Sequence, residues 1–584
     1  MIKECLEIFK EKLDTLGEAY ILDNYVPKDG TYYLVEIGEK EWKVSEAVNI
    51  FYDKKQDCQE GRDSQYYSLI CYMDYYSKLI TMNKPVDQTK IIHSNNYLSV
   101  AVKKESLTEG KLTDQVLDGY YDILKNPRLK YKKANVLALY EETERDCGEP
   151  DAELLVQIQA WVKENIYSME LGNRKKDYLK LFFLFPDETK TRQQYKQEGN
   201  RYIIPNIYNN NDYNISIDGK IYGLPSDNLG MNSKKPYLAN RSRKIEIPYM
   251  LEKEEVLLQA QFYDYLMGLV SKRRTLVYID CIRHEILAYK AGEGSGHSVS
   301  GYFLQMQKGK NEVEIHNADT IVGYNPNLKP VFYYKNVLEV HDVEGYGLVN
   351  KKWELERLID DVFFGKSLIY NYFTKPDDMT LKDGTIINNL MMARDILFAW
   401  FYKNDGIHVW PILNQISMNL VHHSIESGYW KKAQHQLNLR WSLMDYFKIR
   451  HPDKEDTMGE IMYDVKKELS EHLDLKEEWG FSSEQEYYFA VGQLVSFFIS
   501  KSNAMKKPLS FVNPFLNARK DSIIKKHLEV LFKKYNYAIF YQDSRVKNLY
   551  SHVMLYQPQG KIDTEMISAG VTASNLIFKK KGEI

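Results

Sequence analysis

The sequence predicts an α+β N-terminal region followed by an all-α helical-bundle C-terminal domain. Before about residue 345, segments of alternating apolar residues are interspersed with segments whose apolar residues recur every three or four positions. From Trp353 onward almost all apolar residues follow the helical spacing. The length of 584 residues also requires more than one domain, because a single hydrophobic core stops growing at roughly 250 to 300 residues.

Helices and strands alternate in the first region. Residues 1–20 predict a helix because Leu6, Phe9 and Leu13 recur at helical spacing. Asp218 and Gly219 predict a hairpin, since an Asp-Gly pair flanked by alternating apolar residues is typical of a tight turn. Further helices are expected at 112–125 and 151–166, and strands at 31–37, 214–224, 275–282 and 284–292.

The second region is expected to contain helices almost exclusively. The clearest helical spacing occurs at 353–373, 387–401, 484–502 and 521–535. Few strand-like runs interrupt these segments, and the loop at 341–352 precedes the first of them. We therefore expect two domains, residues 1–345 and residues 346–584.

Composition limits the function classes. The formal net charge of −3 excludes indiscriminate nucleic-acid binding, because that binding grows with the number of cations presented, so any nucleic-acid site must be local. The five cysteines form no CxxC pair, and we expect no disulfide, no zinc and no other metal. No run of eighteen apolar residues occurs, and the first twenty residues lack a signal-peptide pattern, so a soluble cytoplasmic protein without membrane contact is expected.

The segment NSKKPYLANRSRK, residues 232–244, concentrates positive charge without any acidic residue. Pro236 and Pro248 favour a loop over a long helix. Such a loop is a candidate site for nucleic-acid phosphates, and the alternative is a loop that is simply solvated. The candidate binding residues are Asn232, Lys234, Lys235, Arg241, Arg243 and Lys244.

A second basic concentration lies in the helical region, between residues 501 and 534. Arg519, Lys526 and Lys533 recur every seven residues, while Ile523, Ile524, Leu528 and Leu531 are expected to face elsewhere. This pattern predicts one apolar and one cationic side of a helix. Lys506, Lys507, Arg519, Lys526 and Lys533 are therefore candidate polyanion-binding residues, with a solvated lysine face as the alternative.

No motif demands catalysis. The glycine-rich stretch at 291–301 fits neither GxGxxG nor GxxxxGK[ST], so a loop between two strands is expected there. Arg545 and His552 stand seven apart on an expected helix and could serve a helical ribonuclease or toxin-like enzyme through general acid/base chemistry. A scaffold that binds no nucleic acid is a third possibility. No catalytic residue and no cofactor is expected.

Two separated blocks resemble a known family. IYGLPSDNLGMNSKKPYL (221–238) is followed by IPYMLEKEEVLLQAQFYDYL (247–266). The second block is YYFAVGQLVSFFISKSNAMKKPLSFVNPFLNARK (487–520), with LFKKYNYAI and AGVTASNLIF after it. Together they resemble the large subunit of type I-B CRISPR Cascade complexes and cover about a third of the chain. The first 200 residues carry no motif of that family.

The resemblance implies a non-catalytic subunit of an RNA-guided DNA-surveillance complex. Its expected partners are guide RNA, target double-stranded DNA, the backbone and guide-end-capping subunits, and a separate helicase-nuclease. In such complexes base pairing reads most of the target, while protein reads a short adjacent duplex motif. The resemblance implies binding of that motif and of the guide end by residues 1–345. Residues 346–584 would follow the displaced strand, in a role like that of a small subunit.

Overall fold

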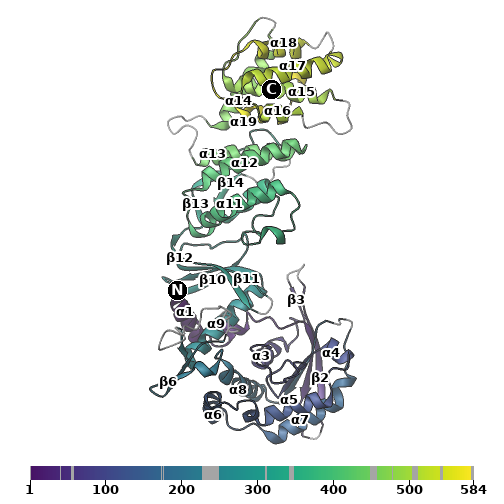
Figure 1. Cartoon of the computed structure of the whole chain (residues 1–584), viewed down its shortest axis with the longest axis vertical. Helices are drawn as coiled ribbons and strands as arrows, with labels where there is room; N and C mark the ends of the chain where they lie inside the picture. Colours follow the sequence, from purple (N-terminus) through teal and green to yellow (C-terminus); the bar gives the residue numbers. More distant parts are fainter. Residues whose placement is uncertain are drawn as a thin grey trace. The chain divides into compact units, whose positions relative to one another are not determined.

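The computed structural model describes residues 2–39, 41–53, 58–172, 174, 176–226, 249–309, 312–340, 347–447, 457–475, 478–502, 511–539 and 544–579. The chain forms two compact units. The first comprises Met1–Lys290 and Ser300–Thr320, and the second comprises Ala291–Val299 and Ile321–Ile584 (Figure 1).

A five-stranded sheet organises the first unit. Its strand order is β3-β2-β1-β5-β4, with β1 and β5 parallel and the other neighbours antiparallel. The strands are β1 (Gly30–Glu36), β2 (Lys43–Asp53), β3 (Cys58–Glu60), β4 (Ser99–Lys103) and β5 (Tyr178–Leu184). A parallel pair requires a crossover, and the long connection between β1 and β5 provides it with helices.

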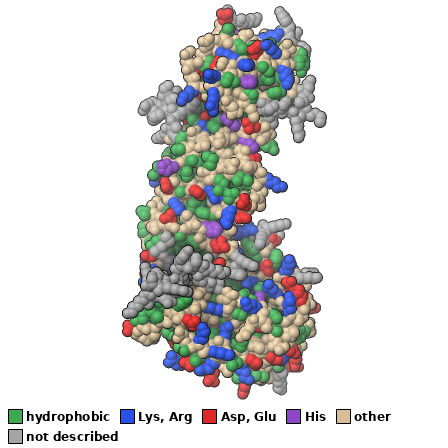
Figure 2. Space-filling model, viewed as in Figure 1, with side chains coloured by type: hydrophobic (Ala, Val, Ile, Leu, Met, Phe, Trp, Pro, Cys, Tyr) green, Lys and Arg blue, Asp and Glu red, His purple; other side chains and the backbone are tan. Residues whose placement is uncertain are grey.

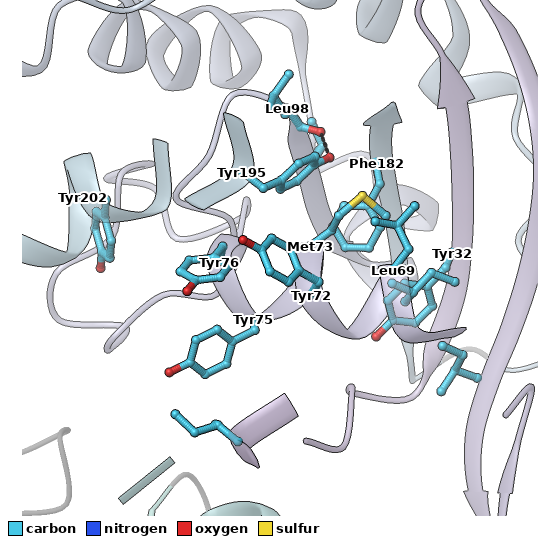
Figure 3. Close-up of a cluster of buried hydrophobic side chains, with 14 of the residues drawn as sticks. Tyr32, Leu69, Tyr72, Met73, Tyr75, Tyr76, Leu98, Phe182, Tyr195 and Tyr202 are labelled. Carbon is cyan, nitrogen blue, oxygen red and sulfur yellow. Dashed lines mark hydrogen bonds between the residues drawn. The ribbon is translucent and has the colours of Figure 1, made fainter. Parts of the chain in front are cut away.

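Helices cover both faces of this sheet, because successive side chains of a strand point to opposite faces. Phe183 of β5 packs against Trp161 of α7 (Ala152–Asn165), at 5.4 Å between ring centroids. Phe182 instead meets Tyr195 of α8 (Glu188–Asn206), at 6.0 Å. Figure 3 shows Tyr195 near Phe182 and α3 (Tyr67–Ser77), with its hydroxyl donating to the carbonyl of Leu98. The layers are therefore helix, sheet, helix.

The remaining elements of the first unit form two further sheets and additional helices. A four-stranded antiparallel sheet has the order β10-β9-β11-β12, and a three-stranded sheet has the order β6-β7-β8. These strands are β6 (Ile215–Ile217), β7 (Lys220–Gly223), β8 (Leu251–Glu252), β9 (Arg274–Asp280), β10 (Glu285–Lys290), β11 (Val299–Lys308) and β12 (Val313–Tyr324). The helices are α1 (Ile2–Leu16), α2 (Ala19–Leu22), α4 (Lys104–Thr108), α5 (Asp114–Lys125), α6 (Ala134–Cys147) and α9 (Lys253–Ser271).

The second unit begins earlier than the expected boundary at 345. The two units divide within β12, between Thr320 and Ile321. The antiparallel pair β13 (Asn327–Tyr333) and β14 (Leu348–Lys351) therefore belongs to the helical unit, because β13 packs on α13 (Trp430–Tyr446). The region 346–584 is accordingly dominated by helices but begins with one strand.

Helices make up the rest of this unit. They are α10 (Lys352–Ile359), α11 (Gly384–Lys403), α12 (Val409–Glu426), α14 (Met458–Asp474), α15 (Glu484–Ser500), α16 (Asn513–Leu516), α17 (Asp521–Tyr535), α18 (Ser544–Leu555) and α19 (Thr564–Thr572). Helix α15 is at the centre of the last group, where it contacts α14, α17, α18 and α19.

One expected helix is interrupted. The segment 353–373 forms α10, a π-helical turn at Asp360–Phe364 and then Gly365, whose φ of +59° is left-handed and ends the helix. The carboxylate of Asp360 accepts hydrogen bonds from the backbone N–H groups of Leu368 (2.7 Å) and Ile369 (3.4 Å). These bonds replace the helical hydrogen bonds that the following residues would otherwise make.

Most local expectations are confirmed. The expected helices at 112–125, 151–166, 484–502 and 521–535 correspond to α5, α7, α15 and α17. Asp151 caps α7 by accepting a 3.0 Å hydrogen bond from the backbone of Leu154. The hairpin of β6 and β7 turns at Asp218 and Gly219, whose φ angles are +50° and +78°.

Candidate nucleic-acid interface

The first predicted site lies outside the described residues. It comprises Asn232, Lys234, Lys235, Arg241, Arg243 and Lys244, which fall in the stretch 227–248. The structure does describe the two strands that this stretch connects. Strand β7 ends at Gly223 and pairs with β8, which begins at Leu251. The basic segment therefore links two adjacent antiparallel strands of the small sheet.

Tyr208 contacts both of these strands through its hydroxyl group. Its hydroxyl lies 2.9 Å from the carbonyl oxygen of Ile221 in β7 and 3.2 Å from that of Leu251 in β8. Gly223 allows the ring to approach, since a Cβ atom there would lie 2.5 Å from the Tyr208 ring. The ring is fully buried. One buried side chain thus contacts both strands that flank this connection, β7 and β8.

Helix α17 carries the described part of the second predicted site. Arg519, just before the helix, and Lys526 and Lys533 within it are all exposed. On the opposite side Ile524, Leu528, Leu531 and Tyr535 are buried. Ile523 was expected on the apolar side but is 39% exposed. Lys506 and Lys507 lie outside the described residues.

The exposed face of α17 combines cations with apolar side chains. Positions 523, 526, 530 and 533 are three or four apart within α17 and therefore share one face of the helix, and Arg519 precedes the helix by two residues. Val530 on this face is 55% exposed. We call Arg519, Ile523, Lys526, Val530 and Lys533 the α17 face.

Little within the described structure neutralises this face. Lys533 forms a 2.5 Å ion pair with Glu529, and the lysine side chain is 73% exposed. An exposed pair of this kind is screened by water and contributes little, so a phosphate can displace the carboxylate. No described carboxylate lies within 4.0 Å of the cationic atoms of Arg519 or Lys526. Elsewhere on the surface, basic and acidic side chains are interspersed (Figure 2). Both cations can therefore meet an external anion.

The structure engages Arg545 and His552, the candidate ribonuclease pair, in contacts within the second unit. Arg545 is ion-paired with Asp474 and donates to the carbonyl of Lys579. The ring of His552 stacks on Trp479, with centroids 4.1 Å apart and planes at 9°. These contacts support the packing around α18 and do not direct the two side chains toward a common reacting atom.

Both ring nitrogens of His552 have a structural role. Nδ1 lies 2.8 Å from the carbonyl of Asn548, and Nε2 lies 3.3 Å from the backbone nitrogen of Trp479. Because a carbonyl only accepts and a backbone N–H only donates, these contacts assign the proton to Nδ1. Neither nitrogen is left over for proton transfer to a substrate.

The glycine-rich stretch is a loop, as expected, and joins β10 to β11. Residues 291–299 belong to the second unit, where they pack on α10. A Cβ atom on Gly294 would lie 3.0 Å from Trp353, and Gly292, with φ of +75°, lies beside Ile369 and Arg357. These glycines therefore permit close packing against α10, which explains their spacing without a phosphate.

A pocket that no sequence pattern singled out lies in the first unit. It is lined by Lys84, Lys130, Asn206 and the asparagine run at 209–211, among others. The asparagine run was visible in the sequence, but Lys84, Lys130 and other lining residues come from positions more than sixty residues earlier in the chain. The pocket is therefore a product of tertiary structure.

In the described part of the chain, no three His, Cys, Asp or Glu side chains are grouped as metal ligands. None of the helices there is both long and apolar enough to cross a bilayer. No family model, curated protein or solved structure matches this chain significantly.

Proposed function

We propose that the chain is the non-catalytic large subunit of a type I-B CRISPR Cascade effector complex. In this role it recognises the short protospacer-adjacent motif in double-stranded DNA, assists duplex opening and recruits a separate helicase-nuclease. Guide RNA, the backbone subunits and the guide-end-capping subunit are its partners. The basic segment at 232–244 acts on the duplex or the guide end, and the helical region follows the displaced strand.

The observation that carries this proposal is the composition of the α17 face. Lys526 and Lys533 are exposed seven residues apart on α17, and Arg519 is exposed just before the helix. Ile523 and Val530 are exposed between these cations. Single-stranded nucleic acid is bound by rows of cations that neutralise phosphates and by side chains that contact the bases. The two sequence blocks that resemble the family lie at the basic segment and around this helix, which supports the same function.

A salt titration of single-stranded DNA binding tests the proposal. Each phosphate contact contributes about 0.7 to the slope of log K against log salt concentration for single strands. Changing Arg519, Lys526 and Lys533 together to alanine should therefore flatten the slope by at most about 2. The same titration on duplex DNA, with Lys234, Lys235, Arg241, Arg243 and Lys244 changed to alanine, tests the basic segment.

A matched control separates local contacts from net charge. Lys366, Lys375 and Lys382 are exposed in the same unit, in the connection between α10 and α11. Changing these three to alanine removes the same charge and should leave the slope unchanged. An equal effect in the two triple variants, or no effect in either, would reject the α17 face as a nucleic-acid contact.

A further inference from the structure

The pocket in the first unit has a size and a polarity that suit a small polar ligand. Its volume is about 250 Å3. This lies just below the roughly 300 to 1,000 Å3 of pockets for drug-sized ligands, so one nucleotide fits better than a larger molecule. Its walls come from the end of α8, the loop after α3 and the chain around Lys130 and Tyr131.

The pocket has more cations than acids. Lys84, Lys130 and Lys133 line it, and Asp212 is the single acidic residue among the described side chains of its wall. Asp212 is paired with Lys133 at 2.9 Å. The pocket wall therefore keeps an excess of positive charge once this pair is counted.

Lys130 is the lysine of the pocket whose positive charge is least compensated by the described residues. Its ammonium donates to the carbonyl oxygen of Pro85, and no described carboxylate lies within ion-pair distance. Burial lowers the pKa of Lys130 to about 8, so the side chain is still mostly charged at neutral pH. A half-buried ammonium with one neutral partner is stabilised by an anion that binds beside it. Lys84 donates to the carbonyls of Asn206 (2.9 Å) and Tyr208.

Two asparagines of the pocket, Asn206 and Asn210, supply a hydrogen-bond acceptor and a hydrogen-bond donor for a ligand. Asn206 is 6% exposed, and its Nδ2 donates to the Tyr131 hydroxyl (2.9 Å) and to the carbonyl of Tyr202 (2.7 Å). Its Oδ1 is left as an acceptor without a partner among the described residues. The Oδ1 of Asn210 accepts from the backbone of Asp212 at 3.1 Å, which leaves its Nδ2 as a donor. A base edge presents the complementary donors and acceptors.

The pocket also lies close to Ser226, the last residue that the structure describes before the basic segment. The backbone N–H of Ser226 donates to the carbonyl of Ile207 (2.8 Å), and that of Asn209 donates to the carbonyl of Leu224 (2.8 Å). Asn209 itself lines the pocket.

We propose that this pocket binds one nucleotide unit, with its phosphate beside Lys130 and its base edge on Asn206 and Asn210. The inference rests on the proposed nucleic-acid function but assigns a new site. The nucleotide can belong to a nucleic-acid strand or be a free nucleoside monophosphate, and the chemistry of recognition is the same.

Calorimetric titration of the full-length chain with each nucleoside 5′-monophosphate and with inorganic phosphate tests the pocket directly. The four monophosphates should bind with unequal affinities, and inorganic phosphate should bind more weakly than the best of them. Fluorescence anisotropy with a single-stranded 12-mer of the preferred base then shows whether the strand uses the same site, because the monophosphate should compete with it. Competition assigns the nucleotide to a strand, and its absence together with monophosphate binding assigns a free nucleotide.

Two variants report on the two halves of the ligand. Lys130→Met keeps the stem but removes the charge and should weaken every monophosphate about tenfold or more. Asn210→Ala should change the order of preference among the bases by about fivefold or more while leaving phosphate binding unchanged. Lys132→Met is the matched control, because Lys132 is exposed and does not line the pocket, and it should bind like the unmodified chain.

Equal affinities for phosphate and all four monophosphates would overturn the nucleotide assignment, as would Lys130→Met binding like Lys132→Met. These outcomes are independent of the salt titration of the α17 face. Monophosphate binding that depends on Lys130, together with an unaffected α17 slope, supports the pocket and rejects the displaced-strand contact. The reverse combination rejects the pocket alone.

Discussion

The hydroxyl of Tyr402 donates a 2.7 Å hydrogen bond to Glu356 Oε2 inside the second unit, and Tyr372 donates one of 2.6 Å to Oε1. Glu356 is fully buried in α10. Burial raises its pKa to about 7, although the two hydroxyl groups lower it in part by stabilising the carboxylate. The side chain therefore titrates near neutral pH in the folded unit.

This titration should make the second unit less stable as pH rises. The folded-state pKa of Glu356 is above its ordinary value of 4.5, so its contribution is fully present below pH 4.5 and is lost as pH rises to about 7. The loss is on the order of 3 kcal/mol, at about 1.4 kcal/mol per pKa unit. Urea unfolding at pH 5, 6, 7 and 8 should show a flatter pH dependence for Glu356→Gln than for the unmodified chain.

Two neighbouring groups do not obscure the comparison. Burial also raises the pKa of Asp360, and this contribution is present in both proteins apart from the charge interaction with Glu356 that the substitution removes. Burial lowers the pKa of Lys352 to about 8, below its ordinary value of 10.5. Its contribution to the pH dependence of stability is therefore confined to the range from about pH 8 to pH 10.5. Parallel pH profiles for the two proteins would show that Glu356 ionises normally.

Gly492 of α15 and Gly570 of α19 should not tolerate a side chain. A Cβ atom on Gly492 would lie 2.3 Å from the carbonyl oxygen of Ile567, and one on Gly570 would lie 2.1 Å from that of Phe489. Both obstacles are backbone atoms, so the helices must separate, and overpacking typically costs about 1 to 3 kcal/mol. Thermal unfolding should show this loss for either change to alanine.

Gly384→Ala is the control for the two glycine variants. Gly384 is the first residue of α11, and a Cβ atom there would meet nothing within 4 Å. Its replacement should leave the melting temperature unchanged or raise it slightly, because alanine is the better helix former. Equal melting temperatures for all three variants would contradict the close contact of α15 and α19.

The sequence predicted individual elements better than it predicted their boundaries and partners. Helices α15 and α17 follow from local apolar spacing, which needs no knowledge of neighbours. The interruption after α10 depends on Gly365 in the left-handed conformation and on Asp360 accepting from the backbone eight and nine residues later, and apolar periodicity signals neither. Ile523 and Ile524 are adjacent on α17, so spacing alone cannot decide which one is buried.

The candidate sites show the same difference between features set by local sequence spacing and features set by tertiary contacts. The common exposed side of Lys526 and Lys533 was predictable because a seven-residue repeat returns to one side of a helix, whereas Arg519 lies before the helix begins. The pocket brings Lys130 together with Asn206 and Asn210 from separate elements, and only the tertiary fold does this. His552 looked like a candidate acid or base because the sequence does not reveal Trp479 against its ring.

The buried ion pair between Asp74 of α3 and Lys180 of β5 should show strong coupling. Both side chains are about 5% exposed, and Tyr25 donates a further 2.9 Å hydrogen bond to Asp74. Lys180→Met leaves a buried carboxylate without its cation and should lower the free energy of unfolding by about 3 to 5 kcal/mol. The double variant Asp74→Asn with Lys180→Met should recover part of that loss. Additive losses in urea unfolding of the single and double variants would show that the two charges act independently.

The last prediction concerns where the helical unit begins. The backbone N–H of Lys335, just after β13, donates to Ser442 Oγ (2.9 Å), and its ammonium is paired with Asp445 (2.7 Å). The backbone N–H of Leu338 donates to Asn438 Oδ1 (3.0 Å). Phe332 of β13 also packs on Tyr446, with ring centroids 5.8 Å apart. One face of α13 is therefore completed by residues that precede 345.

A fragment of residues 321–584 should therefore unfold more cooperatively than one of residues 350–584. The sequence-based boundary predicts that the shorter fragment folds on its own, whereas the structure predicts that it exposes Tyr446 and leaves Asn438 and Ser442 without their partners. Because water can replace the lost partners, each lost hydrogen bond costs about 0.5 to 1.5 kcal/mol. Circular dichroism melts of both fragments and of the full chain provide the measurement. Equal melting temperatures and equal cooperativity for the two fragments would mean that β13 is dispensable and that the helical unit begins near 350.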